Sequence, residues 1–568
     1  MKILLCNIAV RKKPDPFPPV ACTCLMNALK RSGYQSVFYD IDARRPSPEE
    51  LFVYFKREQF DLVGISAVVS TGYKYTKNLA GIIKNACPTT KIILGGNLAV
   101  AYKVVLRKCQ IDLCVIGEGE RVLLNLVKYL DKYGSFEPAR EELFKIKGVV
   151  FLDSRGTCKF TGNDELISSD EIEEPDYKIL DEFSIISQYI QDPLTRADFV
   201  IDPRTHEAKR RGKKMATIFT SKGCVNACTF CHRWVKGYRV IPIDKVISTM
   251  KYLIDKYSVG FFCISDECFG EDKEWLEQFI GQLKPLDILF QVSGARVSII
   301  RKDPTILKRL KEVGLTALYF GIESGSDKML KVMEKNVSKV ENIEAMKICS
   351  EAGIFTIIQL VIGLPGENDF TISETIDFIK KATGELPSLP LVVVNYLQAL
   401  PGTPCYEFLR YNGLLGKTIE DEEGYLLRVS DIDAGEFRQY LNVSEESLPK
   451  VKLWRTKIYF LPMIHWLKSH GWRFPSRQNY KLRDNPGSRV SIKALFKEYL
   501  KTNIWLYRII DICGEWFWGV ILTLDIFSIY GIRKALLILL GIKKDEGRVQ
   551  FKIKGKTLRE IVKMNEYS

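Results

Sequence analysis

The stretch SKGCVNACTFCHRW, residues 221–234, decides how the rest of the chain is interpreted. Its cysteines, Cys224, Cys228 and Cys231, have the spacing C-x3-C-x2-C and follow the strand-like run ATIFTSKG. Three thiolates in so short a loop can bind an iron–sulfur cluster, whose ligands are cysteines gathered in this way. A structural zinc site is the alternative, but it needs four ligands and has only His232 nearby as the fourth. The spacing favours a cluster with one iron open to another molecule.

Around this motif, strand-like and helix-like stretches alternate. The predicted strands are ATIFTSKG, GFFCISDE, ILFQVSGAR, ALYFGIES, TIIQLVIGLPGE and VVVNYLQALPG. Six consecutive strand–helix units predict a partial (β/α)6 barrel over residues 215–425. The cysteine motif would then follow the first strand of that barrel.

The N-terminal residues 1–145 show the same alternation, with nearly continuous apolar strands such as KILLCNIAV and KIILGG. This pattern predicts an α/β domain with a doubly wound, Rossmann-like parallel sheet. Such sheets bind ligands at the carboxyl ends of their strands, here the loops FPPVAC, SAVVSTGY, GGNLA and GEGE. We expect residues 146–214 to be a linker containing a short hairpin.

Composition sets further limits. With 46% hydrophobic and 27% charged residues, the 568-residue chain is neither disordered throughout nor a polytopic membrane protein. Fifteen cysteines at irregular spacing are too sparse for a disulfide framework, and MKILLCNIAV does not resemble a secretory signal. We therefore expect a cytoplasmic protein.

The C-terminal residues 426–568 are predicted to be mostly helical and basic, and six of the eight Trp residues lie after position 450. The segment 516–542 is largely apolar but contains Asp525, Arg533 and Lys534. Its uninterrupted apolar part is shorter than the roughly 20 residues that a membrane span needs. It would form either helices at an anionic membrane surface, on the inner face of the membrane, or a cap that packs on the barrel.

The cysteine triplet, with Phe230 before its last Cys, resembles the signature of the radical S-adenosylmethionine (SAM) superfamily. The resemblance extends through ISDECFG (264–270), GAR (294–296), GIESG (321–325), IGLPGE (362–367) and LPGTP (400–404). It implies a 4Fe-4S cluster on Cys224, Cys228 and Cys231 whose open iron binds SAM. Reductive cleavage of SAM would give a 5′-deoxyadenosyl radical that takes a hydrogen atom from the substrate.

The same resemblance assigns residues to SAM, although GIESG and GLPGE would also suit ordinary β/α turns. The residues implied to bind SAM are Phe230, Ser265, Asp266, Glu267, Arg296, Glu323 and Gly363. Phe230 would lie near the adenine, and the acidic segment 265–267 near the amino group. Catalytic residues beyond these binding groups are not assigned.

Residues 1–145 resemble the cobalamin-binding domain of cobalamin-dependent radical SAM enzymes. The residues assigned to cobalamin are Ser66, Ser70, Thr71, Gly95, Gly96 and Glu118. No His precedes His206, and Asn97 stands where many relatives carry a His, so the D-x-H-x-x-G motif is missing. We expect cobalamin to bind without a His ligand from this domain; the alternative is a flavodoxin-like domain without a cofactor.

The leading hypothesis is a cobalamin-dependent radical SAM methyltransferase that acts on an unactivated carbon or phosphorus through methylcobalamin. A cyclase or ring-rearranging enzyme resembling the anaerobic magnesium-protoporphyrin cyclase is the first alternative. The second is a membrane-surface or RNA-binding protein with a structural cluster. We expect a small-molecule or lipid substrate and an electron donor such as flavodoxin or ferredoxin, and we do not expect nucleic acid as a partner.

Overall fold

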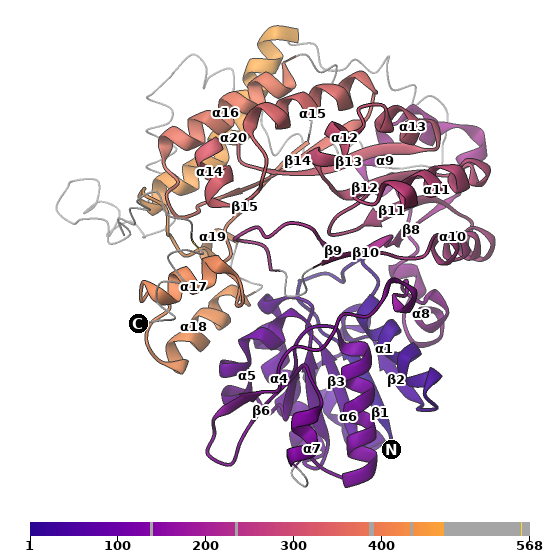
Figure 1. Ribbon diagram of the computed structural model, residues 1–568, viewed down its shortest axis with the longest axis vertical. Helices are drawn as coiled ribbons and strands as arrows, with labels where there is room; N and C mark the ends of the chain where they lie inside the picture. The colour runs from indigo at the N-terminus through magenta and orange to yellow at the C-terminus, as the bar shows by residue number, and fades with distance from the viewer. Residues whose placement is uncertain (137–139, 233–236, 385–390, 432–435, 471–557, 559–568) are drawn as a thin grey trace, which may run out of the picture.

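The computed structural model describes residues 1–470 and 558, apart from 137–139, 233–236, 385–390 and 432–435. Two sheets dominate it: an N-terminal sheet in the lower half of Figure 1, and a curved second sheet in the upper half. This arrangement confirms the predicted class, an α/β protein with a parallel sheet followed by a partial barrel and helices.

The N-terminal sheet has the order β2-β1-β3-β4-β5-β6-β7, and its first five strands are parallel. Successive residues of β1 enter cores on opposite faces, with Ile3 and Leu5 on one side and Leu4 and Cys6 on the other. The strands are β1 (Ile3–Asn7), β2 (Ser36–Tyr39), β3 (Leu62–Ser66), β4 (Lys91–Gly95), β5 (Leu113–Val115), β6 (Val149–Leu152) and β7 (Cys158–Phe160).

Helices cover both faces of this sheet, because both faces are apolar. The buried side chains of α1 (Val20–Arg31) and α6 (Gly119–Tyr133) join the core on one face. Those of α3 (Pro48–Glu58), α4 (Tyr73–Ala86) and α5 (Tyr102–Lys108) join the core on the other. The sheet is therefore doubly wound, as the sequence predicts.

The second sheet has six parallel strands in the order β15-β14-β13-β12-β11-β8. They are β8 (Lys214–Ile218), β11 (Val259–Ser265), β12 (Leu289–Ala295), β13 (Leu315–Glu323), β14 (Phe355–Ile362) and β15 (Leu391–Tyr396). The connecting helices lie on its outer side (Figure 1) and include α10 (Ile243–Tyr257), α11 (Lys273–Leu283), α13 (Ile306–Glu312), α15 (Lys339–Glu351) and α16 (Asp369–Thr383). A short antiparallel hairpin, β9 (Ser221–Cys224) with β10 (Gly237–Val240), interrupts the first strand–helix unit and carries the cysteine motif.

The segment expected as a linker is ordered in two parts. Its hairpin adds β6 and β7 to the N-terminal sheet as antiparallel strands. The following chain reaches the half-barrel, where Phe199 in α9 (Ala197–Val200) packs against Met215, Phe261, Cys263 and Leu289. The amino end of the half-barrel is thereby filled with side chains.

The chain after β15 returns to the N-terminal domain. Helix α17 (Pro404–Tyr411) leads to α18 (Ile419–Val429), where Glu423 pairs with Lys77 at 2.5 Å and accepts a hydrogen bond from the Tyr73 hydroxyl at 2.7 Å. After α19 (Glu436–Gln439), helix α20 (Leu448–His470) packs along α16, and Trp454 Nε1 donates to Asp369 Oδ1 at 2.6 Å. The two domains are therefore tied together at α18 as well as through the connecting segment.

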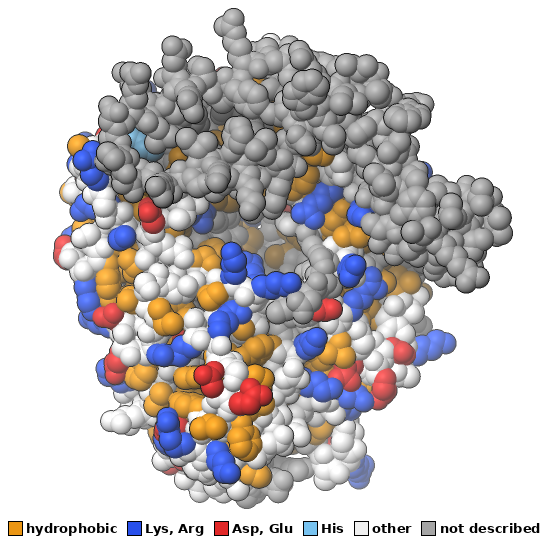
Figure 2. Space-filling model, turned by 180° about the vertical axis from the view of Figure 1, so that it is seen from behind, with side chains coloured by type: hydrophobic (Ala, Val, Ile, Leu, Met, Phe, Trp, Pro, Cys, Tyr) orange, Lys and Arg blue, Asp and Glu red, His pale blue; other side chains and the backbone are white. Residues whose placement is uncertain are grey.

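Two observations concern the surface. On the face drawn in Figure 2, Lys and Arg side chains are interspersed with acidic and apolar ones across the described residues. Among those residues, none of the helices is both long and apolar enough to cross a membrane. The apolar segment 516–542 lies outside the described residues.

Candidate functional site

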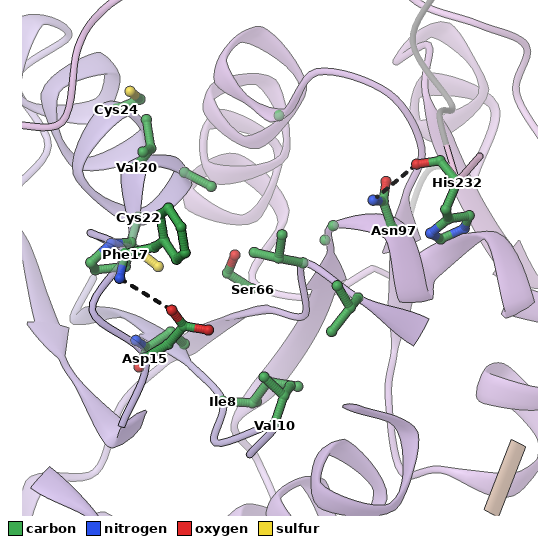
Figure 3. Close-up of a pocket in the computed structure, with 18 of the residues that line it drawn as sticks. Ile8, Val10, Asp15, Phe17, Val20, Cys22, Cys24, Ser66, Asn97 and His232 are labelled. Carbon is green, nitrogen blue, oxygen red and sulfur yellow. Dashed lines mark hydrogen bonds between the residues drawn. The ribbon is translucent and has the colours of Figure 1, made fainter. Parts of the chain in front are cut away.

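A cavity of about 1200 Å³ lies where the carboxyl ends of the two sheets face each other. The N-terminal strands contribute Ser66 and Gly95 to its wall, and β11 is followed there by Glu267. The end of β15 and the helices beyond it contribute uncharged side chains: Asn395, Tyr396, Gln398, Leu400, Val429 and Gln439. Figure 3 shows part of the wall, from the N-terminal loop at Asp15 and Phe17 to Asn97 and His232. Both predicted ligand-binding edges therefore open into one chamber.

The cysteine motif starts where β9, the first strand of the hairpin, ends. Gly223 has a φ of +81°, and a Cβ there would lie 2.1 Å from the carbonyl oxygen of Gly237, so the two strands approach this closely only because residue 223 is Gly. Cys224 ends β9, and Cys228 and Cys231 follow in the loop. Thr229 joins the loop to the half-barrel, with its backbone N–H donating to Met333 O at 3.0 Å. Burial raises the pKa of the Cys228 thiol.

A fourth cysteine lies beside the motif, which the sequence analysis did not single out. Cys268, in the ISDECFG segment, is fully buried, and its thiol hydrogen-bonds Cys224, which together with burial raises its pKa. Among the described residues, no three His, Cys, Asp or Glu side chains are grouped to hold one metal ion. The ligands of a four-iron cluster bind separate irons, so the motif does not require such a grouping.

In the segment 265–267 at the end of β11, alternate side chains point to opposite sides, as in any extended chain. Ser265 and Glu267 line the cavity, and the buried Ser265 Oγ has no hydrogen-bond partner. Asp266 is buried and accepts bonds from Thr220 N at 2.7 Å and Ser221 Oγ at 2.8 Å. Burial raises its pKa to about 6. Asp266 therefore braces the start of the cysteine hairpin.

A second group of ionisable residues lies near Cys228. Glu323, at the end of β13, has a φ of +65° and pairs with Lys335 Nζ at 3.0 Å. Burial opposes the charge on Lys335, but Glu323 and Cys228 raise the pKa of its ammonium. Arg296 Nε lies 3.8 Å from Glu271 Oε1, and its buried Nη1 has no hydrogen-bond partner. The sequence analysis assigned Arg296 and Glu323 but missed Lys335, which lies twelve positions after Glu323.

The remaining two assigned SAM residues are held by their neighbours. Phe230 is partly buried and packs against the main core. Gly363 has a φ of +87°, and the Tyr440 ring lies 2.6 Å from where a Cβ would be. Glu367 accepts hydrogen bonds from the backbone N–H groups of Gly363 and Leu364, and burial raises its pKa to about 7.

On the N-terminal wall, the residues assigned to cobalamin that line the cavity are Ser66, Thr71, Gly95, Gly96 and Glu118. Gly96 has a φ of +83°, and a Cβ there would lie 2.4 Å from Ala67 O. Ser70 instead is fully buried, and its hydroxyl bonds to Asn97 O at 3.5 Å. The wall is therefore shaped by close backbone approach more than by side chains.

His232 comes to this wall from the cysteine loop. Asn97 Nδ2 donates to His232 O at 3.5 Å (Figure 3), and neither ring nitrogen of His232 has a hydrogen-bond partner. Burial lowers the pKa of the imidazole to about 4. Sequence reasoning considered His232 only as a zinc ligand, because contact with the N-terminal domain depends on the tertiary structure.

Glu118 is the assigned cobalamin residue with the most protein contacts. Its carboxylate pairs with Arg239 at 2.7 Å and Lys222 at 3.1 Å, and it accepts a bond from Ile167 N at 2.7 Å. Burial opposes its ionisation, but these partners outweigh burial and lower its pKa. Lys222 and Arg239 belong to the cysteine hairpin, and the sequence analysis named neither.

Comparison with known proteins identifies two domains in the chain. Residues 218–379 match the family model of the radical SAM superfamily, and residues 7–127 match that of the B12-binding domain. Residues 218–379 thus form a radical SAM domain, and residues 7–127 form a B12-binding domain. This is the pair of domains that the sequence analysis expects. A radical SAM domain implies a 4Fe-4S cluster and SAM, and the N-terminal domain implies cobalamin.

Individual relatives cover different parts of the chain. It is 29% identical to an anaerobic magnesium-protoporphyrin IX monomethyl ester cyclase from Cereibacter sphaeroides, over 63% of this chain and 56% of the cyclase. It is 28% identical to an uncharacterized methyltransferase from Pyrococcus horikoshii, over 73% of this chain and 84% of the relative. The match thus spans little more than half of the cyclase's length.

A solved structure shares the overall fold. The cobalamin-dependent SAM radical enzyme OxsB, solved with aqua-cobalamin and SAM bound, has a TM-score of 0.62 at 16% identity. The match covers 95% of this chain and 74% of OxsB. At this identity the likeness is one of fold.

Proposed function

We propose that this chain is a methyltransferase that uses cobalamin and radical SAM chemistry on an unactivated carbon or phosphorus. The observation that carries the proposal is the single cavity, whose N-terminal wall contains Gly95 and Gly96 and whose opposite wall contains Ser265 and Glu267. Because strand ends of both sheets open into this one chamber, a substrate there could reach both proposed cofactors. The uncharacterized methyltransferase from Pyrococcus horikoshii matches over most of its own length, which supports the same reaction class.

The residues on the barrel side suit a cluster and SAM. Cys224, Cys228 and Cys231 would hold the cluster, since thiolates are its usual ligands. Ser265 Oγ and Arg296 Nη1 are buried polar atoms without partners, which is costly unless a ligand satisfies them. The family assignment of Glu267, Glu323, Phe230 and Gly363 to SAM also belongs to this proposal, whereas Asp266 would act by bracing the hairpin.

The residues on the N-terminal side suit a corrinoid. A Cβ added to Gly95 would meet no atom within 4 Å, so that backbone is open to a ligand, and Gly96 supplies the turn beside it. Ser66 and Thr71 place hydroxyl groups on the same wall. When bound, the three cofactors together supply hydrogen-atom abstraction and a transferable methyl group.

The substrate would occupy the part of the cavity between β15 and α19. Gln398 Nε2 donates to Gln439 Oε1 at 2.6 Å there, and the wall around the pair is uncharged. Amide groups among apolar side chains orient a ligand by hydrogen bonds without requiring it to be charged. We propose a small-molecule or lipid substrate that presents an uncharged part to this wall.

A cyclase or ring-rearranging reaction is the second candidate, and the identity with the anaerobic cyclases favours it. The two reactions differ in the fate of the methyl group of SAM. In the proposed methyltransferase the methyl group reaches the corrinoid and then the product, whereas in a cyclase it does not reach the product.

The test is anaerobic purification and cluster reconstitution of the full chain, followed by incubation with methyl-deuterated SAM, a reductant and cobalamin. Mass spectrometry should find bound corrinoid, deuterated methyl on that corrinoid and 5′-deoxyadenosine. 5′-Deoxyadenosine without labelled corrinoid would reject the methyltransferase and leave the cyclase. The Cys158→Ala variant, which changes a half-buried cysteine outside the cavity wall, should give the same products as the unchanged chain.

Cellular context belongs to the same proposal. We propose a cytoplasmic enzyme that receives electrons from flavodoxin or ferredoxin and touches the inner face of the membrane through residues 516–542. The test of membrane contact is flotation with anionic vesicles: the full chain should float, and a truncation before residue 500 should not. Equal behaviour of the two chains would reject membrane contact and favour the cap that packs on the barrel.

A further inference from the structure

The hairpin that carries Cys224 has two cations directly opposite each other. Lys222 in β9 and Arg239 in β10 are cross-strand partners, two pairs away from Cys224 and Gly237. Like charges at opposed positions destabilise an antiparallel pair. Only 13% of the Arg239 side chain and 33% of the Lys222 side chain are exposed, so water screens them poorly. The hairpin therefore needs a counter-charge.

The counter-charge comes from the other domain. Glu118, at the start of α6, offers one carboxylate to both cations: Arg239 donates from Nη2 at 2.7 Å and from Nη1 at 3.1 Å, and Lys222 Nζ lies 3.1 Å away. Its side chain is 4% exposed. Glu120 adds a second carboxylate, 3.1 Å from Lys222 Nζ. A two-pronged Arg–carboxylate pair fixes direction as well as charge.

The arrangement also fixes where the cysteine loop stands. Cys224 lies two residues after Lys222, so both side chains project from the same face of β9. At the far end of the loop, Asn97 holds the backbone of His232. Two strand-end loops of the N-terminal domain, GGN at 95–97 and GEGE at 117–120, therefore contact the segment that carries the three cysteines.

We propose that Glu118 is a positioning residue that holds the Cys224 hairpin closed, so that the iron–sulfur site is completed by the cobalamin domain. The proposal rests on the proposed function only for the identity of the cluster, not for the reaction. Because coupling between two sites is reciprocal, cluster loading and corrinoid retention should strengthen each other by the same factor. Glu118 would thus act through the hairpin, although it also lies on the cavity wall.

The test measures iron in the full-length Glu118→Gln variant after anaerobic reconstitution, together with the EPR spectrum of the reduced cluster. Glutamine keeps the shape but leaves Arg239 and Lys222 without their shared carboxylate, and we expect about a tenfold loss of bound iron. Glu423→Gln is the matched control, because it removes another carboxylate between the domains, the one on Lys77, away from the hairpin. It should load iron as the unchanged chain does.

Charge rescue separates this role from a general effect on folding. In Glu118→Gln/Lys222→Gln, Arg239 no longer faces a cation, so at least half of the lost iron should return. If Glu118→Gln does not fold, this double variant alone is the test, since it is expected to fold and to load iron. Iron loading by Glu118→Gln equal to the unchanged chain, or no recovery in the double variant, would overturn the proposal. Neither readout depends on methyl transfer, so a failure of the proposed reaction would leave this test decisive.

Discussion

The two walls of the cavity come from sheets of the same kind but are built from different chemistry. The N-terminal wall presents Gly95, Gly96 and the hydroxyls of Ser66 and Thr71. Behind the opposite wall lie ionisable groups removed from water, among them Asp266 and the Glu323–Lys335 pair. Close backbone approach suits a large ligand held by shape, whereas paired charges suit a cluster and a charged ligand. The difference is the one that the proposed corrinoid on one side and the proposed cluster with SAM on the other would require.

Charge also connects the two walls. The carboxylate of Glu118 belongs by sequence to the N-terminal domain, yet its partners Lys222 and Arg239 belong to the cysteine hairpin. The N-terminal domain thus supplies a carboxylate to two cations of the hairpin. The comparison makes four predictions, which begin with the largest expected effect.

The first prediction asks whether the three cysteines of the motif are indispensable. Replacing Cys224, Cys228 or Cys231 by Ala should abolish the cluster's charge-transfer absorbance and all 5′-deoxyadenosine formation, because two thiolates cannot anchor the cluster. Corrinoid retention should persist at least in part. The measurements are iron content and mass spectrometry, with Cys158→Ala as the control. SAM cleavage by a triple variant would refute the assignment.

The second prediction tests whether the stability of the half-barrel depends on the buried Glu323–Lys335 ion pair. Lys335→Met leaves Glu323 buried without its partner, which costs about 3–5 kcal/mol of folding free energy. Lys2→Met is the control, since its pair with Glu58 is solvent-exposed and should contribute little to stability. Thermal unfolding of the cluster-free proteins compares the two. The double variant Glu323→Gln/Lys335→Met should recover part of the lost stability, because no unpaired charge is left. Equal losses of stability in Lys335→Met and Lys2→Met would contradict the prediction.

The third prediction concerns pH. The buried Glu367 carboxyl has its pKa raised from 4.5 to about 7, so its neutral form is favoured in the folded protein. This contribution is fully present below pH 4.5 and is lost as the pH rises through about 7. It amounts to at most about 3 kcal/mol. Glu367→Gln keeps an acceptor for Gly363 N–H but does not titrate. The thermal midpoint of this variant should therefore depend less on pH between about 4.5 and 7. The same pH dependence as in the unchanged chain would contradict the prediction.

The fourth prediction tests the glycine turn on the N-terminal wall. Gly96→Ala would place a Cβ 2.4 Å from Ala67 O at a φ of +83°, so the turn must shift. We expect about tenfold weaker corrinoid retention with little change in iron content. Gly81→Ala in α4 is the control, because a Cβ there meets nothing within 4 Å. Loss of iron together with corrinoid in Gly96→Ala would blur the distinction between the walls.

Much of this protein was determined by local sequence. Apolar strands alternating with helical stretches predict both parallel sheets, because strands buried on both faces must be apolar throughout. The cysteine spacing marks the loop, and the strand-end segments around Ser66, Gly95 and Ser265 mark the cavity, since parallel strands expose their carboxyl ends on one edge. These features depend on residues close together in the chain.

The contacts between distant segments were decided only by the tertiary structure. Sequence could not show that Asp266 turns inward to Thr220 and Ser221, or that Lys335 pairs with Glu323 beside Cys228. It assigned Glu118 to cobalamin, whereas the fold gives its carboxylate to two cations more than 100 residues away. The reason is physical: strand and turn preferences are local, but the partner of a buried charge is chosen by packing, which brings together whichever groups neutralise each other away from water.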